Sequence, residues 1–128
     1  MNAEVERAIE GLRAAYPDAR VAADDDGQGG AWVVVDPVDI GSLYQQDSSW
    51  FGFRITFQYP YADVYPHFVR SDLVRSDGRA LGDGISSGHT FMGRPALQLS
   101  RRSNRLNPST DTAALKLAKV LQWLKTHP

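Results

Sequence analysis

Two periodicities run along this chain, a helical one near each end and a strand-like one between them. Near the start, Asn2 can cap a helix that Pro17 ends. Its apolar residues recur at spacings of three and four, at Val5, Ala8, Ile9, Leu12 and Ala15. Towards the end, Asn107 and Pro108 fit an N-cap and a first helical position. The core-facing stripe predicted for this second helix is Ala113, Leu117, Val120, Leu121 and Leu124.

The middle of the chain predicts four strands, at residues 20–23, 31–35, 51–59 and 67–74. The third has the clearest pattern, because large apolar residues alternate with smaller or polar ones. Period two places five of them on one face of a sheet, namely Phe51, Phe53, Ile55, Phe57 and Tyr59. We therefore expect one face of the sheet to pack on helices and the other to face water.

Residues 75–94 contain five glycines and predict a long irregular loop. Loops of about 20 residues are uncommon in compact domains and often carry function. The order of elements is helix, strands, long loop and helix. It predicts a single α+β domain over residues 1–128, with a four-stranded antiparallel meander covered by helices on one side.

Composition narrows the possible functions. Fourteen basic and fifteen acidic residues give a net charge of −1, which argues against nucleic acid or a membrane surface as the main partner. The chain has no cysteine, so disulfides, thiolate zinc sites and a cysteine nucleophile are impossible. The histidines, His67, His89 and His127, have no metal-ligand spacing. We expect no metal and no cofactor.

The first ten residues alternate acidic and apolar side chains, unlike a signal peptide. No stretch approaches the roughly 20 apolar residues that a membrane span needs. The expected location is therefore the cytoplasm.

Residues 84–88 match the nucleophile-elbow pattern G-x-S-x-G, centred on Ser86. The elbow requires a strand before the serine and a helix after it. Glycine and aspartate precede this serine, and no helical periodicity follows. The flanks thus disfavour a hydrolase.

Two other groups of side chains are candidates for binding a partner. Arg101, Arg102 and Arg105 form a basic cluster that is either a solvated loop or a docking patch for a carboxylate, which arginine binds through two parallel hydrogen bonds. Three tyrosines lie around two prolines and form either an exposed aromatic surface or part of the core. They are Tyr59, Tyr61 and Tyr65.

These landmarks together resemble the ubiquitin-conjugating (UBC) fold, and in particular its prokaryotic members. Residues 57–60 (FQYP) and 66–69 (PHFV) look like the proline-rich turn between the family's third and fourth strands. His89 lies where the family's His-Pro-Asn motif begins. Residues 106–108 (LNP) resemble the segment that opens the helix after the active site, and 99–111 resemble the prokaryotic members. The resemblance implies a bacterial conjugation pathway, with a ubiquitin-like protein and its activating enzyme as partners.

The chain also departs from this family. The expected cysteine falls near Gln98 or Leu99, and Thr90 and Phe91 replace the Pro and Asn of the motif. One interpretation is a binding or adaptor variant without thioester chemistry.

Another is a carrier that holds the ubiquitin-like protein as a serine oxyester. Ser100 is then the nearest nucleophile, His89 its candidate base, and Ser86 and Ser87 the alternatives. A third is a small chaperone or adaptor domain unrelated to conjugation, which the near-neutral charge disfavours.

Overall fold

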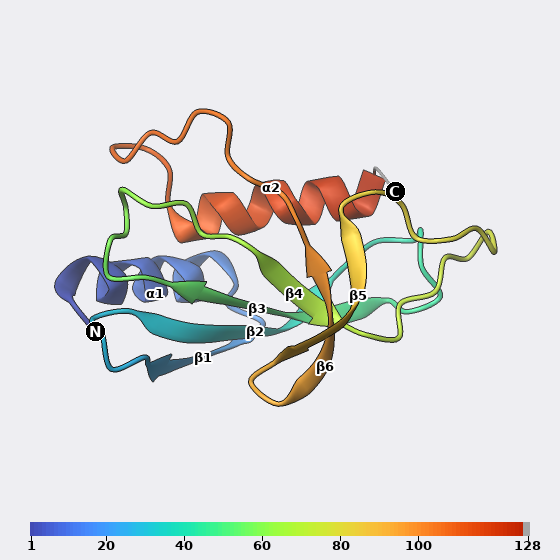
Figure 1. The fold of residues 1–128 in the computed structure, drawn as a ribbon, viewed down its shortest axis with the longest axis horizontal. Helices are drawn as coiled ribbons and strands as arrows, with labels where there is room; N and C mark the ends of the chain where they lie inside the picture. The colour runs from blue at the N-terminus through green and yellow to red at the C-terminus, as the bar shows by residue number, and fades with distance from the viewer. Residues whose placement is uncertain (127–128) are drawn as a thin grey trace.

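The computed structural model describes residues 1–126 and has two layers, an antiparallel sheet and a pair of helices on one side of it (Figure 1). Within these residues the sheet has six strands, in the order β1-β2-β3-β4-β6-β5. The elements are α1 (Ala3–Ala15), β1 (Arg20–Asp25), β2 (Ala31–Asp39), β3 (Ser48–Ile55), β4 (His67–Arg70), β5 (Ile85–Phe91), β6 (Arg94–Leu99) and α2 (Ala113–Thr126). This confirms an α+β fold with a helix at each end of the chain.

The first helix forms as its sequence predicts. The side chain of Asn2 accepts a hydrogen bond from the backbone N–H of Val5 (2.9 Å) and so caps the helix. The helix ends at Ala15, just before Tyr16 and Pro17. Its buried face is Val5, Ala8, Ile9 and Leu12, whereas Ala15 is exposed.

The second helix begins later than Asn107 and Pro108 predict. Asn107 instead closes a turn, because its carbonyl accepts hydrogen bonds from the N–H groups of Thr110 and Asp111. The cap of α2 is Thr112, whose hydroxyl accepts the N–H of Leu115 (3.1 Å). The two possible capping residues, Asn107 and Thr112, lie five residues apart. Only Thr112 is followed directly by a buried residue, Ala113. The predicted stripe is buried at Ala113, Leu117, Val120 and Leu124 and partly buried at Leu121.

The predicted third strand is correct in position but too long. Phe51, Phe53 and Ile55 are fully buried on the helix-covered face, and β3 ends at Ile55. The chain then turns, with the N–H of Tyr59 donating to the carbonyl of Thr56 (3.0 Å). Phe57 is consequently exposed, so the five-residue face is wrong beyond Ile55.

Residues 75–94 are not one long loop, and the sheet has more than four strands. The first four strands form the expected meander, although β4 ends at Arg70 rather than Val74. Residues 85–99 then form a hairpin, β5 and β6, in which β6 pairs with β4. The glycines of this segment do not indicate an irregular loop. Gly88 (φ 82°) lies at a bulge in β5, and Gly93 (φ 80°) lies in the hairpin turn.

The face of the sheet away from the helices carries an aromatic cluster that the pattern did not predict. The rings of Trp32, Trp50 and Phe68 all contact Phe91, with centroid distances of 5.2–6.1 Å. Phe91 lies over Gly52, where a Cβ would be only 2.6 Å from its ring. No helix within residues 1–126 is both long and apolar enough to cross a membrane.

Candidate functional site

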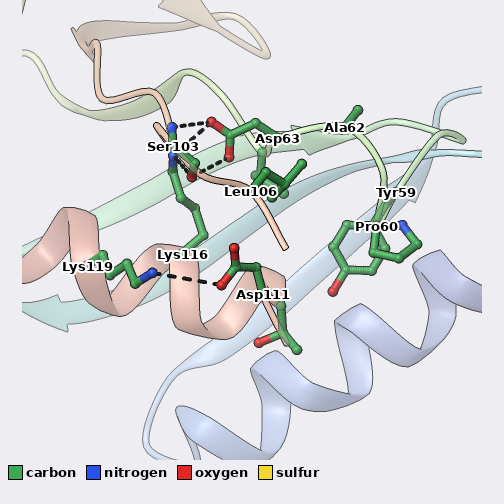
Figure 2. Close-up of a pocket in the computed structure, with 11 residues that line it drawn as sticks. Tyr59, Pro60, Ala62, Asp63, Ser103, Leu106, Asp111, Lys116 and Lys119 are labelled. Carbon is green, nitrogen blue, oxygen red and sulfur yellow. Dashed lines mark hydrogen bonds and ion pairs between the residues drawn. The ribbon is translucent and has the colours of Figure 1, made fainter. Parts of the chain in front are cut away.

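A buried polar cluster joins the turn before β4, the loop after β6 and helix α2 (Figure 2). The carboxylate of Asp63 accepts hydrogen bonds from the backbone N–H (2.7 Å) and hydroxyl (2.9 Å) of Ser103. The Nζ of Lys116 lies 3.0 Å from this carboxylate and 2.9 Å from the Ser103 hydroxyl, and only 8% of its side chain is exposed. The cluster therefore ties the loop after β6, at Ser103, to the turn before β4 and to α2.

Asp63 is charged in this environment. Burial alone would raise the pKa of its carboxyl group, but the Ser103 and Lys116 hydrogen bonds hold that pKa below its usual range. The carboxylate thus balances the buried ammonium of Lys116, and neither charge is left for a ligand.

Next to this cluster, the loop and α2 border an open groove of about 450 Å³. Its four exposed cations are Arg101, Arg102, Arg105 and Lys119. Asp111 is the only acid among the described residues that line the groove, and it is paired with Lys119 at 3.8 Å. The groove is therefore strongly basic.

The three arginines of the groove have no acidic partner. Among residues 1–126, no carboxylate lies within 4.0 Å of any of them. Arg101 lies over the ring of Trp123 (5.0 Å to the centroid) and Arg102 over that of Tyr65 (4.0 Å). Stacking orients a guanidinium plane without using its N–H groups.

The three candidate tyrosines have different environments. Tyr59 is buried, and its hydroxyl accepts the N–H of Ala113 (3.1 Å), which ties the turn to the first residue of α2. Tyr65 supports Arg102, as described above. Tyr61 is 78% exposed. Tyr61 is thus the most exposed of the three, Tyr65 is partly exposed and Tyr59 belongs to the core, so the three do not form one aromatic surface.

His89 and Ser100 lie on the same side of the sheet, the side away from the helices. His89 is opposite Ala96 on β6, and the hydroxyl of Ser100, one residue past the end of β6, is 3.2 Å from the side-chain nitrogen of Gln98. The residue that His89 contacts is Ser86, with Oγ and Nε2 3.0 Å apart. No hydrogen bond joins His89 to Ser100 among the described residues. The structure thus pairs the histidine with one of the alternative serines.

The expected cysteine positions differ in accessibility. Leu99 is fully buried on the helix-covered face, whereas Gln98 is partly exposed on the opposite face. Of the other two histidines, His67 is fully buried against Phe53, and His127 lies outside the described residues.

Sequence reasoning missed the roles of Asp63, Ser103, Lys116 and Lys119. One signal was available for Lys116, which interrupts the apolar stripe of α2 one residue before Leu117. A lysine on a buried stripe needs an acidic partner. Asp63 is the isolated acid in the otherwise apolar and proline-rich segment 59–66, but nothing local indicates that the two residues meet.

No group of three or more His, Asp or Glu side chains within residues 1–126 is arranged to hold a metal ion. Comparison with protein-family models found no match, and neither did comparison with curated proteins or with solved structures.

Proposed function

We propose that the protein is a cysteine-free, UBC-like binding component of a bacterial ubiquitin-like conjugation pathway, acting in the cytoplasm as an adaptor. In this proposal the basic groove binds the carboxylate-bearing terminal segment of a ubiquitin-like protein. The observation that carries it is the set of three arginines that have no acidic partner within residues 1–126, on a loop held at Ser103 by Asp63 and Lys116.

The chemistry of the groove favours a carboxylate. Each guanidinium can donate two parallel hydrogen bonds to one carboxylate, a geometry that a flexible ammonium lacks. Trp123 and Tyr65 orient two of the guanidinium groups before any ligand binds. Less side-chain entropy is then lost on binding.

The element order supports placing the groove in a conjugation pathway. The chain has an N-terminal helix, a meander of four strands, a turn at residues 59–66 and a final helix on the same side as the first (Figure 1). The β5–β6 hairpin is an addition to the expected arrangement. No relative supports the proposal, which depends on element order and on the groove alone. The activating enzyme is the second expected partner, because the resemblance to the UBC fold implies an enzyme that acts on the same ubiquitin-like protein.

The proposal is tested with a bacterial ubiquitin-like protein that ends in a free carboxylate. Isothermal titration should show binding that weakens as salt is added, since exposed charges are screened. Arg102→Glu and Arg105→Glu should each weaken binding by about tenfold or more, because a repulsive charge replaces an attractive one. Arg79→Glu is the matched control, since Arg79 is also an exposed arginine but lies outside the groove.

Three results would overturn the proposal. One is equal loss of affinity in all three variants, and another is no binding to the wild-type protein. The third is displacement of the ubiquitin-like protein by inorganic phosphate, at phosphate concentrations similar to the dissociation constant of the ubiquitin-like protein. That result would assign the groove to a phosphorylated ligand instead.

A further inference from the structure

Ser86 and His89 form an exposed serine–histidine pair on the edge strand β5. Their Oγ and Nε2 atoms are 3.0 Å apart, within hydrogen-bonding distance. Ser86 is exposed and His89 is partly so. Because β5 is the last strand of the sheet, a second molecule can approach the pair from the side as well as from the face.

A bulge in β5 creates this pair. In a regular strand, residues three apart point to opposite faces. Here Ser86 is opposite Gln98 and His89 is opposite Ala96, so three steps on β5 match two steps on β6. The extra residue, with Gly88 at φ 82°, puts both side chains on the same face. The packing of Phe68 near the imidazole (6.3 Å between ring centroids) also holds His89 on that face.

The pair is not a hydrolase elbow, because Ser86 lies within a strand and no helix follows it. It does contain a nucleophile within reach of a base, which is the minimum requirement for acyl transfer to a serine. The strand that carries it begins beside the basic groove. Gly84 packs against Trp123, which lines the groove, and the carbonyl of Gly84 accepts the N–H of Ser100 (2.8 Å).

We infer that Ser86 is an acyl-acceptor residue and that His89 is its general base. The donor is an activated carboxyl group, a thioester or an active ester. The Ser86 oxygen forms a bond to the acyl carbon while the bond from that carbon to the leaving sulfur or oxygen breaks. The serine proton passes to His89 Nε2 and then to the leaving group. The products are an oxyester on Ser86 and a free thiol or alcohol, so no oxidant or further reactant is needed.

This inference concerns chemistry, whereas the proposed function concerns binding in the groove, and each can fail alone. The test uses p-nitrophenyl acetate as the donor and the full-length protein. We expect a burst of nitrophenolate close to one equivalent and the mass of one acetyl group added to the peptide that contains residues 85–91. Alkaline hydroxylamine should remove that group, because it cleaves serine oxyesters but not the amides formed on lysine.

Four variants locate the chemistry. Ser86→Ala should abolish the burst, whereas Ser87→Ala and Ser100→Ala should retain it. Ser87 is the matched control, since it is an exposed neighbour of the same type on the same strand. His89→Gln keeps a hydrogen-bonding side chain but is not a base, and it should slow acetylation about 100-fold. It should also change the dependence of the acetylation rate on pH.

An unchanged burst in Ser86→Ala would overturn the inference, as would acetylation of Ser87 or Ser100 in its place. So would the absence of any hydroxylamine-sensitive acetyl group on the wild-type protein. A pH profile that His89→Gln leaves unchanged would overturn the role of the histidine as a base.

Discussion

Two sets of polar side chains on the same loop have opposite environments. Ser103 is bonded to Asp63 and Lys116, and in this cluster the buried ammonium lies directly against a carboxylate. The neighbouring arginines, Arg101 and Arg102, are exposed and contact only aromatic faces among the described residues. The first set is fully paired, whereas the arginines of the second set donate no hydrogen bond to any residue in the described range 1–126.

The difference separates the part of the loop that maintains structure from the part that can bind. Buried polar groups must be paired, because an unpaired charge inside a protein is costly. Exposed arginines carry no such requirement and contribute little to stability. We therefore expect variants of the buried cluster to change folding, and variants of the arginines to change binding alone.

The largest effect should come from Lys116→Met, which removes the buried ammonium and leaves Asp63 without its counter-charge. Breaking a buried pair in this way costs about 3 kcal/mol or more. The free energy of unfolding, measured with urea, should fall by that amount. The double variant Asp63→Asn with Lys116→Met should recover part of the loss. No recovery would mean that the lysine acts through packing and not through its charge.

The next effect concerns the buried histidine, His67. Burial is the main cause that lowers its pKa from 6.5 to about 3; the charge of Lys116 contributes to this shift and that of Asp63 opposes it. The unfolded chain therefore binds the proton more readily than the folded protein. The stability contribution is complete above pH 6.5 and is lost as the pH falls from 6.5 towards 3.

Between about pH 7.5 and pH 4.5, this histidine should account for a loss of about 2–3 kcal/mol. Urea unfolding at both pH values, in the wild-type protein and in His67→Leu, measures its share, since the remaining carboxylates titrate in both proteins. The same pH dependence in the two proteins would contradict the assignment.

A smaller effect tests where α2 begins. Thr112 caps the helix through its hydroxyl, whereas Asn107 closes only a turn. Thr112→Ala should cost about 1 kcal/mol of stability, and Asn107→Ala clearly less. Thermal unfolding of both variants checks the ranking. A larger loss of stability in Asn107→Ala than in Thr112→Ala would indicate that the helix begins at Asn107, as the sequence predicts.

The smallest effect on stability should come from the arginines. Arg102→Ala and Arg105→Ala remove exposed side chains and should change the free energy of unfolding by about 0.5 kcal/mol or less. If either variant destabilises the protein as much as Lys116→Met does, the arginines also maintain the structure, and the distinction between the two sets of side chains is wrong.

Local patterns predicted much of this fold. The helix from Ala3, the start of α2 within six residues and the first four strands all follow from apolar spacing and from residues with known turn or capping preferences. These features depend on near neighbours in the chain. The same reasoning overextended the strand at residues 51–59, because alternation continued past Ile55 although the backbone turned at Thr56.

The remaining features depend on contacts between distant residues. Part of the glycine-rich segment forms β5, because its backbone hydrogen-bonds to the free edge of β6. The bulge in β5 accommodates the positive φ of Gly88. Asp63 and Lys116 are 53 residues apart, so no local pattern shows that they meet. Among the candidate residues, the basic cluster was predicted directly. The partner of His89 was not, because a one-residue bulge decided which serine faces it.

The central claim is that the arginines of the groove have unused donors that bind a carboxylate. The most direct measurement is nuclear magnetic resonance of the arginine Nε–Hε groups as a bacterial ubiquitin-like protein is added, with its terminal carboxylate free or converted to an amide. We predict that the signals of Arg101, Arg102 and Arg105 shift with the free carboxylate and not with the amide, while Arg79 stays unchanged. Equal shifts with both forms, or shifts at Arg79 alone, would contradict the account.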